Sequence, residues 1–517
     1  MDEPVAGDEE LLPQSGQEDS ERRSKSDQLL QVNRYRVDGS LLVSDRRDTT
    51  KKGKLGGRRI TLFDRAGEIV TQWTSARSLY HSWIDYVTDG KDAAVICDSA
   101  RVGTLLDNYR RDNVHVTQVI HTNHREDPET PLDGGLADRF KILTVLDSFD
   151  SVAILTGSQR NDLLDNHLGT GNLHALPNIF AGHNFTGHAI APRGKGVIVA
   201  RLMPVKRLEQ SIQTIGTLRD SGATLDIYGD GPEKDNLQAF IDDTHLEDSV
   251  KLNGYAPAAY KKFEGASFTL LTSFSEGMPI VLLEAMTAGC IPIAYDLKYG
   301  PSDIITHGKD GFLVPLGDIE ELSATLRQFL EMPEAEVAAM RSAAREKVEQ
   351  FSSQTVTRRW AEALEAGREA KTAVKRVEGR SGLRAATFTN DKLHLSFVVS
   401  GEAAAEPEWM MLAVIGRSMP IYFRVPCTYT LIDEELRADA VIPSELFSSP
   451  TADTVDVFVD VRVDGNRRRM RLSAGEVELP EAFERTTPYS TDQGNLSFRI
   501  DGPDTVADEG IQREIAG

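Results

Sequence analysis

The chain has 517 residues, of which 40% are hydrophobic and 27% are charged. This composition is typical of a globular protein of roughly three domains, and it excludes a disordered or fibrous protein for most of the length. The net charge of −22 argues against a nucleic-acid-binding protein, because a negative field repels phosphate backbones.

Membrane and redox signals are also lacking in the sequence. No apolar run approaches the ~20 residues that cross a bilayer, and the N-terminal stretch MDEPVAGDEELL is acidic where a signal peptide would be basic. We therefore expect a cytoplasmic protein, with peripheral association at the inner face of the plasma membrane as an open alternative. Cys97, Cys290 and Cys427 lie far apart, so they predict neither a disulfide framework nor a zinc site.

The N-terminal part of the chain changes character twice. Residues 1–32 are polar and rich in charge, which predicts a disordered acidic tail. Between residues 33 and 192, apolar runs such as VHVTQVIH and SVAILTGS alternate with helix-like segments, which predicts a Rossmann-like domain with a parallel sheet. Seven Lys and Arg residues between residues 46 and 59, here called the basic cluster, form either a solvated loop or a groove for an anionic acceptor.

A more regular alternation follows in residues 193–375. The runs GVIVARL, ATLDIYGDG, SFTLLTS and CIPIAYD predict strands, with helices between them and a last helix around Trp360 that packs back across the cleft between the domains. Residues 386–478 alternate with a period of two between turn signals, which predicts an accessory β-sandwich, and residues 479–517 are expected to be a tail. The expected fold class is α/β, with two doubly wound Rossmann-like domains facing a cleft and a C-terminal β-sandwich.

The stretch SEGMPIVLLEAM places Glu276 on a loop and Glu284 two turns into the helix that follows. The preceding strand ends at Thr272 and the helix begins near Pro279, so the N–H groups of its first turn can bind an anion such as phosphate. Glu276 can reach a hydroxyl group beside that phosphate. The Glu284 carboxylate either accepts hydrogen bonds from ribose hydroxyls or forms an ion pair, and both alternatives are open.

A second junction between a strand and a helix, ARLMPVKRLEQSI, supplies the cations Arg201 and Lys206. Taken singly, such side chains are more often surface charges. Together with a helix N-terminus they can neutralise a diphosphate without a metal ion. The chain contains no Asp-x-Asp tripeptide of the kind that holds a divalent cation in many nucleotide-sugar enzymes. The glycine turn YGDGP lacks the full pattern of a dinucleotide site.

These segments resemble glycosyltransferase family 4, whose members are retaining enzymes of the GT-B fold. The resemblance is carried by ARLMPVKRLEQSI, LDIYGDGPEKDNLQ, LNGYA and SFSEGMPIVLLEAMTAGCIPIAYD, and it covers roughly residues 33–365. KYGPSDIITHGKDGFLVP is similar to the branch that contains poly(glycerol-phosphate) alpha-glucosyltransferase, other teichoic-acid glycosyltransferases and protein glycosyltransferases. The sequence departs from the family where LGG at residues 55–57 follows no strand, so the N-terminal domain is expected to be truncated.

The resemblance implies a role for each matching residue. Arg201 and Lys206 would bind the donor diphosphate and matter most to the rate, Glu276 would contact the transferred sugar, and Glu284 would hold the ribose. The implied donor-binding set also contains the nucleobase neighbours Gly254 and Tyr255 and the loop residues Gly277, Met278, Pro279 and Ile280.

His121 ends the run VHVTQVIH, at the carboxyl edge of the predicted sheet, where ligands bind in such folds. The resemblance implies a catalytic histidine near the transferred sugar at this place. His124, three residues later, is the alternative match or a support, on the sugar or acceptor side.

The resemblance implies a metal-independent, cofactor-free hexosyltransferase. The donor would be a nucleotide sugar, expected to be UDP-linked glucose or N-acetylglucosamine, and the acceptor a cell-surface polymer such as a polyol phosphate. Two alternative functions stay open: transfer to Ser or Thr of a protein, and a non-catalytic subunit that binds a glycan or a partner. Assembly into a homo-oligomer is also open.

Overall fold

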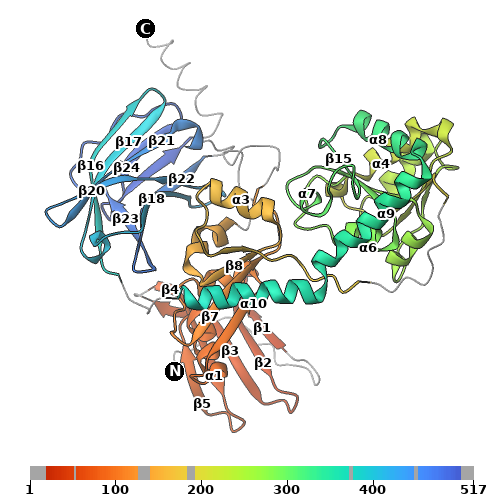
Figure 1. Ribbon diagram of the computed structural model, residues 1–517. Coiled ribbons are helices and arrows are strands. Elements are labelled where there is room, and N and C mark those ends of the chain that lie inside the picture. Colours follow the sequence, from red (N-terminus) through yellow and green to blue (C-terminus); the bar gives the residue numbers. More distant parts are fainter. Residues whose placement is uncertain are drawn as a thin grey trace, which may run out of the picture. The chain divides into compact units, whose positions relative to one another are not determined.

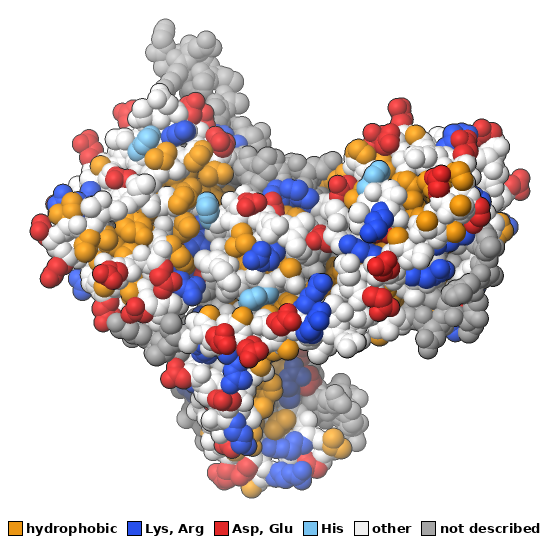
Figure 2. Space-filling model, in the orientation of Figure 1, with side chains coloured by type: hydrophobic (Ala, Val, Ile, Leu, Met, Phe, Trp, Pro, Cys, Tyr) orange, Lys and Arg blue, Asp and Glu red, His pale blue; other side chains and the backbone are white. Residues whose placement is uncertain are grey.

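The computed structural model describes residues 19–51, 54–125, 140–182, 192–371, 377–447 and 452–501. Contacts divide the chain into two compact units, Met1–Ala93 with Val102–Val114 and Ala94–Arg101 with His115–Gly517 (Figure 1). Within the described ranges, no helix is long and apolar enough to cross a membrane. Acidic and basic side chains are interspersed over the face shown in Figure 2, so the net negative charge does not form a single-sign surface there.

The first unit contains a five-stranded antiparallel sheet whose neighbours follow chain order. Its elements are β1 (Asp19–Arg23), β2 (Leu29–Tyr35), β3 (Leu41–Lys51), β4 (Lys54–Phe63), β5 (Ile69–Trp73) and the following helix α1 (Ala76–Thr88). The predicted disordered tail is therefore wrong for residues 19–32, and residues 33–73 form this sheet instead of βα units. Charged strands can fold here because their charges are paired: Arg22, 5% exposed, donates to Asp48 at 2.6 Å. Residues 1–18 lie outside the described residues.

The described residues of the basic cluster lie on the paired strands β3 and β4 and not on a loop; Lys52 lies outside the described residues. Arg58 donates two hydrogen bonds to Asp45, at 2.8 and 2.7 Å. Arg46 pairs with Asp48 at 3.1 Å. Because carboxylates of the same sheet neutralise these guanidinium groups, the hairpin gives no separate support for an anion groove; the side chains of residues 51–55 lie outside the described ones.

The second unit begins with a four-stranded sheet in the order β6-β7-β8-β9, in which β7, β8 and β9 are parallel. The elements of this stretch, in chain order, are β6 (Ala93–Cys97), α2 (Ala100–Leu106), β7 (Val114–Ile120), the 3-10 segment η2 (Phe140–Ser148), β8 (Ser151–Ile154), α3 (Gly157–Asp165) and β9 (Leu173–Ala175). Most of α2 belongs to the first unit. Every residue of β7 is buried, as expected for a central parallel strand that is covered on both faces. This sheet is the Rossmann-like part of the N-terminal half.

The next sheet has six parallel strands in the order β12-β11-β10-β13-β14-β15. Its strands are β10 (Lys195–Val199), β11 (Thr224–Tyr228), β12 (Val250–Leu252), β13 (Phe268–Leu271), β14 (Ile291–Tyr295) and β15 (Phe312–Val314). The strand order reverses between β10 and β13, and ligands of such sheets bind at this switch point.

Helices alternate with these strands as the periodicity predicted. They are η3 (Pro204–Lys206), α4 (Leu208–Thr217), η4 (Arg219–Ser221), α5 (Lys234–Asp243), η5 (Ala259–Gly265), α6 (Ile280–Ala288), α7 (Pro301–Ile304), α8 (Ile319–Glu331), α9 (Glu334–Val348), η6 (Glu349–Phe351) and α10 (Ser353–Glu369). The last helix, α10, contains Trp360 and returns to the four-stranded sheet: Lys371, just after it, lies 3.2 Å from Asp150. Gly367 of α10 packs so closely that an added Cβ would lie 2.4 Å from the His115 ring.

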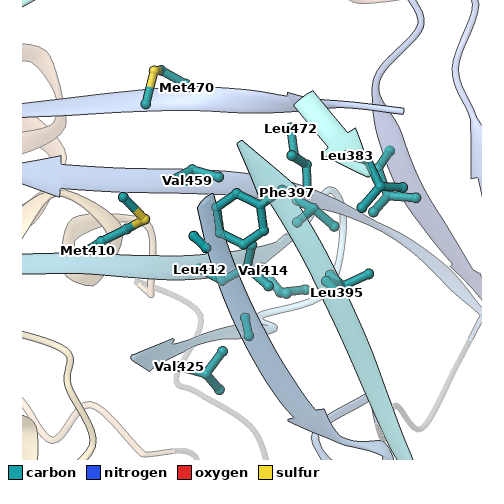
Figure 3. Packing of buried hydrophobic residues seen from close by; sticks show 14 of the residues in the cluster. Leu383, Leu395, Phe397, Met410, Leu412, Val414, Val425, Val459, Met470 and Leu472 are labelled. Atoms are coloured by element: carbon teal, nitrogen blue, oxygen red, sulfur yellow. The ribbon is translucent and has the colours of Figure 1, made fainter. Parts of the chain in front are cut away.

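The C-terminal region is a β-structure of two packed faces around an apolar core that includes Phe397, Leu412 and Val459 (Figure 3). Its elements are β16 (Arg380–Thr389), β17 (Lys392–Ser400), η7 (Glu402–Ala404), β18 (Trp409–Gly416), β19 (Tyr422–Pro426), β20 (Thr428–Ile432), β21 (Glu435–Pro443), η8 (Ser444–Phe447), β22 (Asp453–Val463), β23 (Asn466–Ser473), β24 (Thr486–Ser490) and β25 (Leu496–Ile500).

The predicted boundaries of the sandwich were too narrow. It begins at Arg380, and β24 and β25 add a hairpin within the segment that was expected to be a tail. Leu496, Phe498 and Ile500 are fully buried, because they alternate with polar residues and complete the apolar core. Residues 502–517 lie outside the described residues.

A buried ionic cluster anchors the sandwich to the four-stranded sheet's connections. Arg424, with a fully buried side chain, donates to Asp147 at 2.5 Å and to the His167 carbonyl at 3.0 Å. Asp460 is equally buried and accepts from Arg467 at 2.8 Å. The positive charges of Arg467 and Arg469 outweigh the opposing effect of burial, so the pKa of Asp460 lies well below its usual range.

Candidate active site

A cavity of about 470 Å³ lies at the switch point of the six-stranded sheet, where β10 and β13 end. The predicted site residues among those lining it are Arg201, Lys206, Glu276, Met278, Pro279 and Ile280. The structure therefore brings both predicted cations together with the loop glutamate and the start of α6. These residues come from segments about seventy positions apart, and only the parallel order of the strands joins them.

The glycine turn YGDGP shapes one wall of this region. Beyond β10, Ala200 donates to the Tyr228 carbonyl at 3.0 Å, and Leu202 donates to the Asp230 carbonyl at 3.0 Å. A Cβ added to Gly229 would lie 1.7 Å from the carbonyl oxygen of Ala200. The turn is therefore glycine-rich because two backbones approach each other closely, and it holds the segment that leads to Arg201.

Lys206 lies on a loop that β13 holds in place. The Thr272 hydroxyl, at the end of β13, lies 3.1 Å from the Lys206 carbonyl and 3.0 Å from the Arg207 carbonyl. The Ser211 hydroxyl lies 2.9 Å from the same Thr272 oxygen. Farther along, Phe274 donates its backbone N–H to the Val205 carbonyl at 2.8 Å. The Lys206 backbone is thus fixed before any ligand enters.

The Lys206 ammonium and the Glu276 carboxylate form an ion pair of 2.6 Å inside the cavity. Their side chains are 18% and 13% exposed, respectively, whereas Arg201 is exposed. Helix α6 begins beside them at Ile280, and its N-cap, Pro279, makes no side-chain cap bond. The arrangement can bind an anion with two cations and a helix N-terminus, while Glu276 remains close enough to accept from a hydroxyl group.

Gly277 joins this site to His121 of the four-stranded sheet. A Cβ on Gly277 would lie 2.2 Å from the His121 carbonyl oxygen, so only glycine allows this approach. His121 Nε2 lies 2.5 Å from Asp98 Oδ1. Asp98 follows β6 and His121 follows β7, and these strands are neighbours. Asp98 was not among the predicted site residues, although its place directly after the apolar run AAVIC was a usable signal.

His124 does not belong to the cavity lining. It is 3% exposed, lies 3.3 Å from Asp162 and stacks on Tyr299 with ring centroids 5.5 Å apart. Burial lowers its pKa, which keeps the ring neutral. The two predicted roles of His124, contact with the sugar or acceptor and support of His121, stay predictions.

Four predicted donor-binding residues lie outside the cavity lining: Gly254, Tyr255, Gly277 and Glu284. Gly254 follows β12 with a φ of 72°, and its carbonyl accepts from Gly229 at 2.9 Å. Tyr255 is 76% exposed. Glu284 lies on α6 and is half-buried. Their predicted contacts with base and ribose stay predictions. In the described ranges, no three His, Cys, Asp or Glu side chains gather as metal ligands would.

The chain resembles known proteins in sequence and in fold. The profile of the family Glycosyl transferases group 1 matches residues 192–347. Poly(ribitol-phosphate) alpha-N-acetylglucosaminyltransferase of Staphylococcus aureus (strain COL) is 29% identical over 277 residues, 53% of this chain and 55% of that protein. Poly(glycerol-phosphate) alpha-glucosyltransferase of Bacillus subtilis (strain 168) is 24% identical over 474 residues, 85% of this chain and 68% of that protein. The chain spans about half the length of the first of these relatives.

Among solved structures, a TarM mutant of S. aureus in complex with Fondaparinux, alpha-GlcNAc-glycerol and UDP has a TM-score of 0.51 at 22% identity. The match covers 69% of this chain and 73% of that chain, and at this identity it shows the fold. The family match and the shared fold lead to one conclusion: residues 192–347 form a glycosyl transferases group 1 domain, and the chain has the GT-B fold.

Proposed function

We propose that this chain is a retaining hexosyltransferase that moves glucose or N-acetylglucosamine from a UDP-linked donor to a polyol-phosphate polymer. The carrying observation is the cavity at the switch point, where Arg201, Lys206 and the uncapped start of α6 face the same space. Two relatives act on poly(ribitol phosphate) and poly(glycerol phosphate), and a neighbouring structure contains UDP. These names support the choice of donor and acceptor.

The donor diphosphate is bound by Arg201, Lys206 and the backbone N–H groups of Met278 and Ile280. Positive charge and aligned amides match the charge of a diphosphate without a divalent cation or another cofactor. Glu284 holds the ribose hydroxyls. Gly254 and Tyr255 flank the nucleobase.

The transferred sugar lies between Glu276 and His121, which the close approach of Gly277 brings together. Glu276 accepts hydrogen bonds from sugar hydroxyls and orients the ring. In the retaining step, the bond from the anomeric carbon to the diphosphate breaks as the acceptor oxygen bonds to the same face. The acceptor proton passes to the departing diphosphate oxygen. The protein contributes positioning and stabilisation of the leaving group.

The experiment is a transfer assay on the full chain. UDP-glucose and UDP-N-acetylglucosamine are each offered with poly(glycerol phosphate), poly(ribitol phosphate) and a Ser/Thr-rich peptide, and products are read by mass spectrometry. We expect sugar addition to a polyol phosphate that persists in EDTA, with an α-linkage by NMR. Addition to the peptide alone would favour the protein O-glycosyltransferase alternative. UDP binding without transfer to any acceptor would favour the non-catalytic subunit.

A further inference from the structure

A second cluster of charged residues lies beside the cavity without lining it. Its centre is Asp162 on α3, which accepts two hydrogen bonds from Arg125 Nη2, both at 2.8 Å, and one from the Tyr299 hydroxyl. His124 Nε2 lies 3.3 Å from Asp162, and Lys298 Nζ lies 3.7 Å from it. Arg125 and Asp162 belong to the four-stranded-sheet region, whereas Lys298 and Tyr299 follow β14 of the six-stranded sheet.

The cluster is buried and ionised. Arg125 is 6% exposed and Tyr299 is 1% exposed. Burial opposes ionisation of Asp162, but hydrogen bonds from His124, Tyr299 and Arg125 outweigh it and hold the pKa of Asp162 well below its usual range. Burial and the Asp162 carboxylate raise the pKa of Tyr299, which therefore stays a hydrogen-bond donor. A buried carboxylate that accepts several hydrogen bonds holds its donors in place, because a donor that moved away would leave buried polar groups without a hydrogen bond.

Two more hydrogen bonds join the four-stranded-sheet region to residues 298–303. Asn123 Nδ2 donates to the Lys298 carbonyl at 2.7 Å and lies 3.5 Å from the Ser275 hydroxyl. On the other side, the Ser158 backbone N–H donates to Asp303 Oδ1 at 3.0 Å. The segment from residue 298 to residue 303 is thus held at both ends.

This segment, residues 298–303, supports the loop that carries Glu276. A Cβ on Gly300 would lie 2.5 Å from Pro279 Cδ and 3.4 Å from the Gly277 carbonyl oxygen. Gly277 in turn packs on the His121 carbonyl. A displacement of residues 298–303 would therefore move the sugar-facing loop relative to His121.

We infer that Asp162 is a positioning residue. It holds residues 298–303 against the end of β7, and through them it keeps the loop of Glu276 and Gly277 opposite His121. The diphosphate-binding side chains Arg201 and Lys206 take no part in the hydrogen bonds and ion pairs described for this cluster, so Asp162 acts on the orientation of the sugar and leaves nucleotide affinity unchanged. The expected loss of catalytic rate rests on the proposed function, whereas the expected displacement of residues 298–303 does not.

The test compares full-length Asp162→Asn with wild type and with Asp220→Asn. Asp220 pairs with Arg327 at 3.0 Å on an exposed surface, so its substitution removes a carboxylate at a place unrelated to the site. Amide hydrogen exchange is followed in peptides covering residues 275–282 and 298–306, with α4 as the internal reference. UDP affinity is measured by calorimetry, and kcat and KM by the transfer assay.

For Asp162→Asn we expect exchange in residues 298–306 to rise at least about tenfold, with α4 unchanged and the Kd of UDP within about twofold of wild type. We expect kcat to fall at least about tenfold with little change in the KM of the donor. Unchanged exchange in both peptides would overturn the inference, whether or not the chain transfers sugar. If the wild-type chain transfers no sugar, the proposed function fails and the exchange result still decides this inference.

Should Asp162→Asn not fold, as judged by circular dichroism, Tyr299→Phe replaces it, because it removes one hydroxyl and keeps the ring stacked on His124. Amide exchange in residues 298–306 should rise in Tyr299→Phe as well, but by less than is expected for Asp162→Asn. A folded Tyr299→Phe chain with wild-type exchange would overturn the inference.

Discussion

Lys206→Ala removes the ammonium group that pairs with Glu276 inside the cavity. Lys206 is 18% exposed at its side chain, lies 2.6 Å from Glu276, and has its backbone carbonyl bound by the Thr272 hydroxyl. The ion pair and the bound backbone thus hold the group in place within the cavity. Preorganised charge of this kind contributes most where negative charge develops, which in the proposed reaction is the departing diphosphate.

The expected loss follows from that role. Removal of one preorganised donor to a developing oxyanion lowers kcat by roughly 10²–10³-fold, or about 2.7–4 kcal/mol. Stability should change much less, by about 1 kcal/mol, because Glu276 keeps access to water through the cavity and partly exposed pairs contribute little. Glu276→Gln should also lower kcat. The double variant should lose less than the sum of the two single losses, since the two side chains share one ion pair.

The assay measures kcat, KM and thermal unfolding of Lys206→Ala beside Lys195→Ala. Lys195 begins β10, the strand that leads to the cavity, but it lies 3.9 Å from Asp226, is 44% exposed and does not line the cavity. Lys195→Ala should keep wild-type kinetics. A Lys206→Ala chain with kcat within about threefold of wild type, and the same melting temperature, would refute the assigned role of this lysine.

Three further predictions concern the partner of His121, the buried ion pairs of the sandwich and two buried histidines. Asp98→Asn should lower kcat roughly tenfold or more with UDP affinity kept, because His121 loses the carboxylate that orients its ring, and Asp98→Glu should restore part of the rate; equal kcat in all three chains would argue against it. Asp460→Asn should lower the free energy of unfolding in urea by about 3–5 kcal/mol, since it leaves buried guanidinium groups unpaired, and a loss below about 1 kcal/mol would contradict this. Burial lowers the pKa values of His115 and His174, so the folded state favours their neutral forms. Their contribution to stability should be complete above about pH 6.5 and fall as the pH drops below it, whereas an unfolding free energy that does not fall between about pH 7 and pH 5 would contradict that sign.

Elements with strong apolar periodicity were predictable from the sequence. The runs GVIVARL, SFTLLTS and CIPIAYD became β10, β13 and β14, because central parallel strands are buried on both faces and read as continuous apolar segments. The junctions after β10 and β13 therefore predicted that Arg201, Lys206 and Glu276 lie at one edge of the six-stranded sheet.

The first antiparallel sheet was not predictable in the same way. Its strands carry many charges, and composition alone pointed to disorder for residues 19–32. The strands are stable because pairs such as Arg22 with Asp48 form across positions 26 residues apart. The short strands β24 and β25 were missed because five-residue segments with a single turn give a weak signal.

The supporting residues of the site depend on long-range contacts. Asp98 meets His121 because β6 and β7 are neighbours, and nothing in their separation of 23 residues indicates that pairing. Asp162 and Tyr299 are 137 residues apart and meet only when the two parallel sheets are assembled. Local patterns indicate which residues stand at strand ends, and the fold decides which of them touch.

Calorimetric titration of the full chain with UDP tests the central claim most directly, because it needs neither the acceptor nor the identity of the sugar. We expect one binding site whose affinity for UDP falls at least about tenfold in Lys206→Ala and stays at the wild-type level in Lys195→Ala. Absence of UDP binding by the wild-type chain, or equal affinity in both variants, would contradict it.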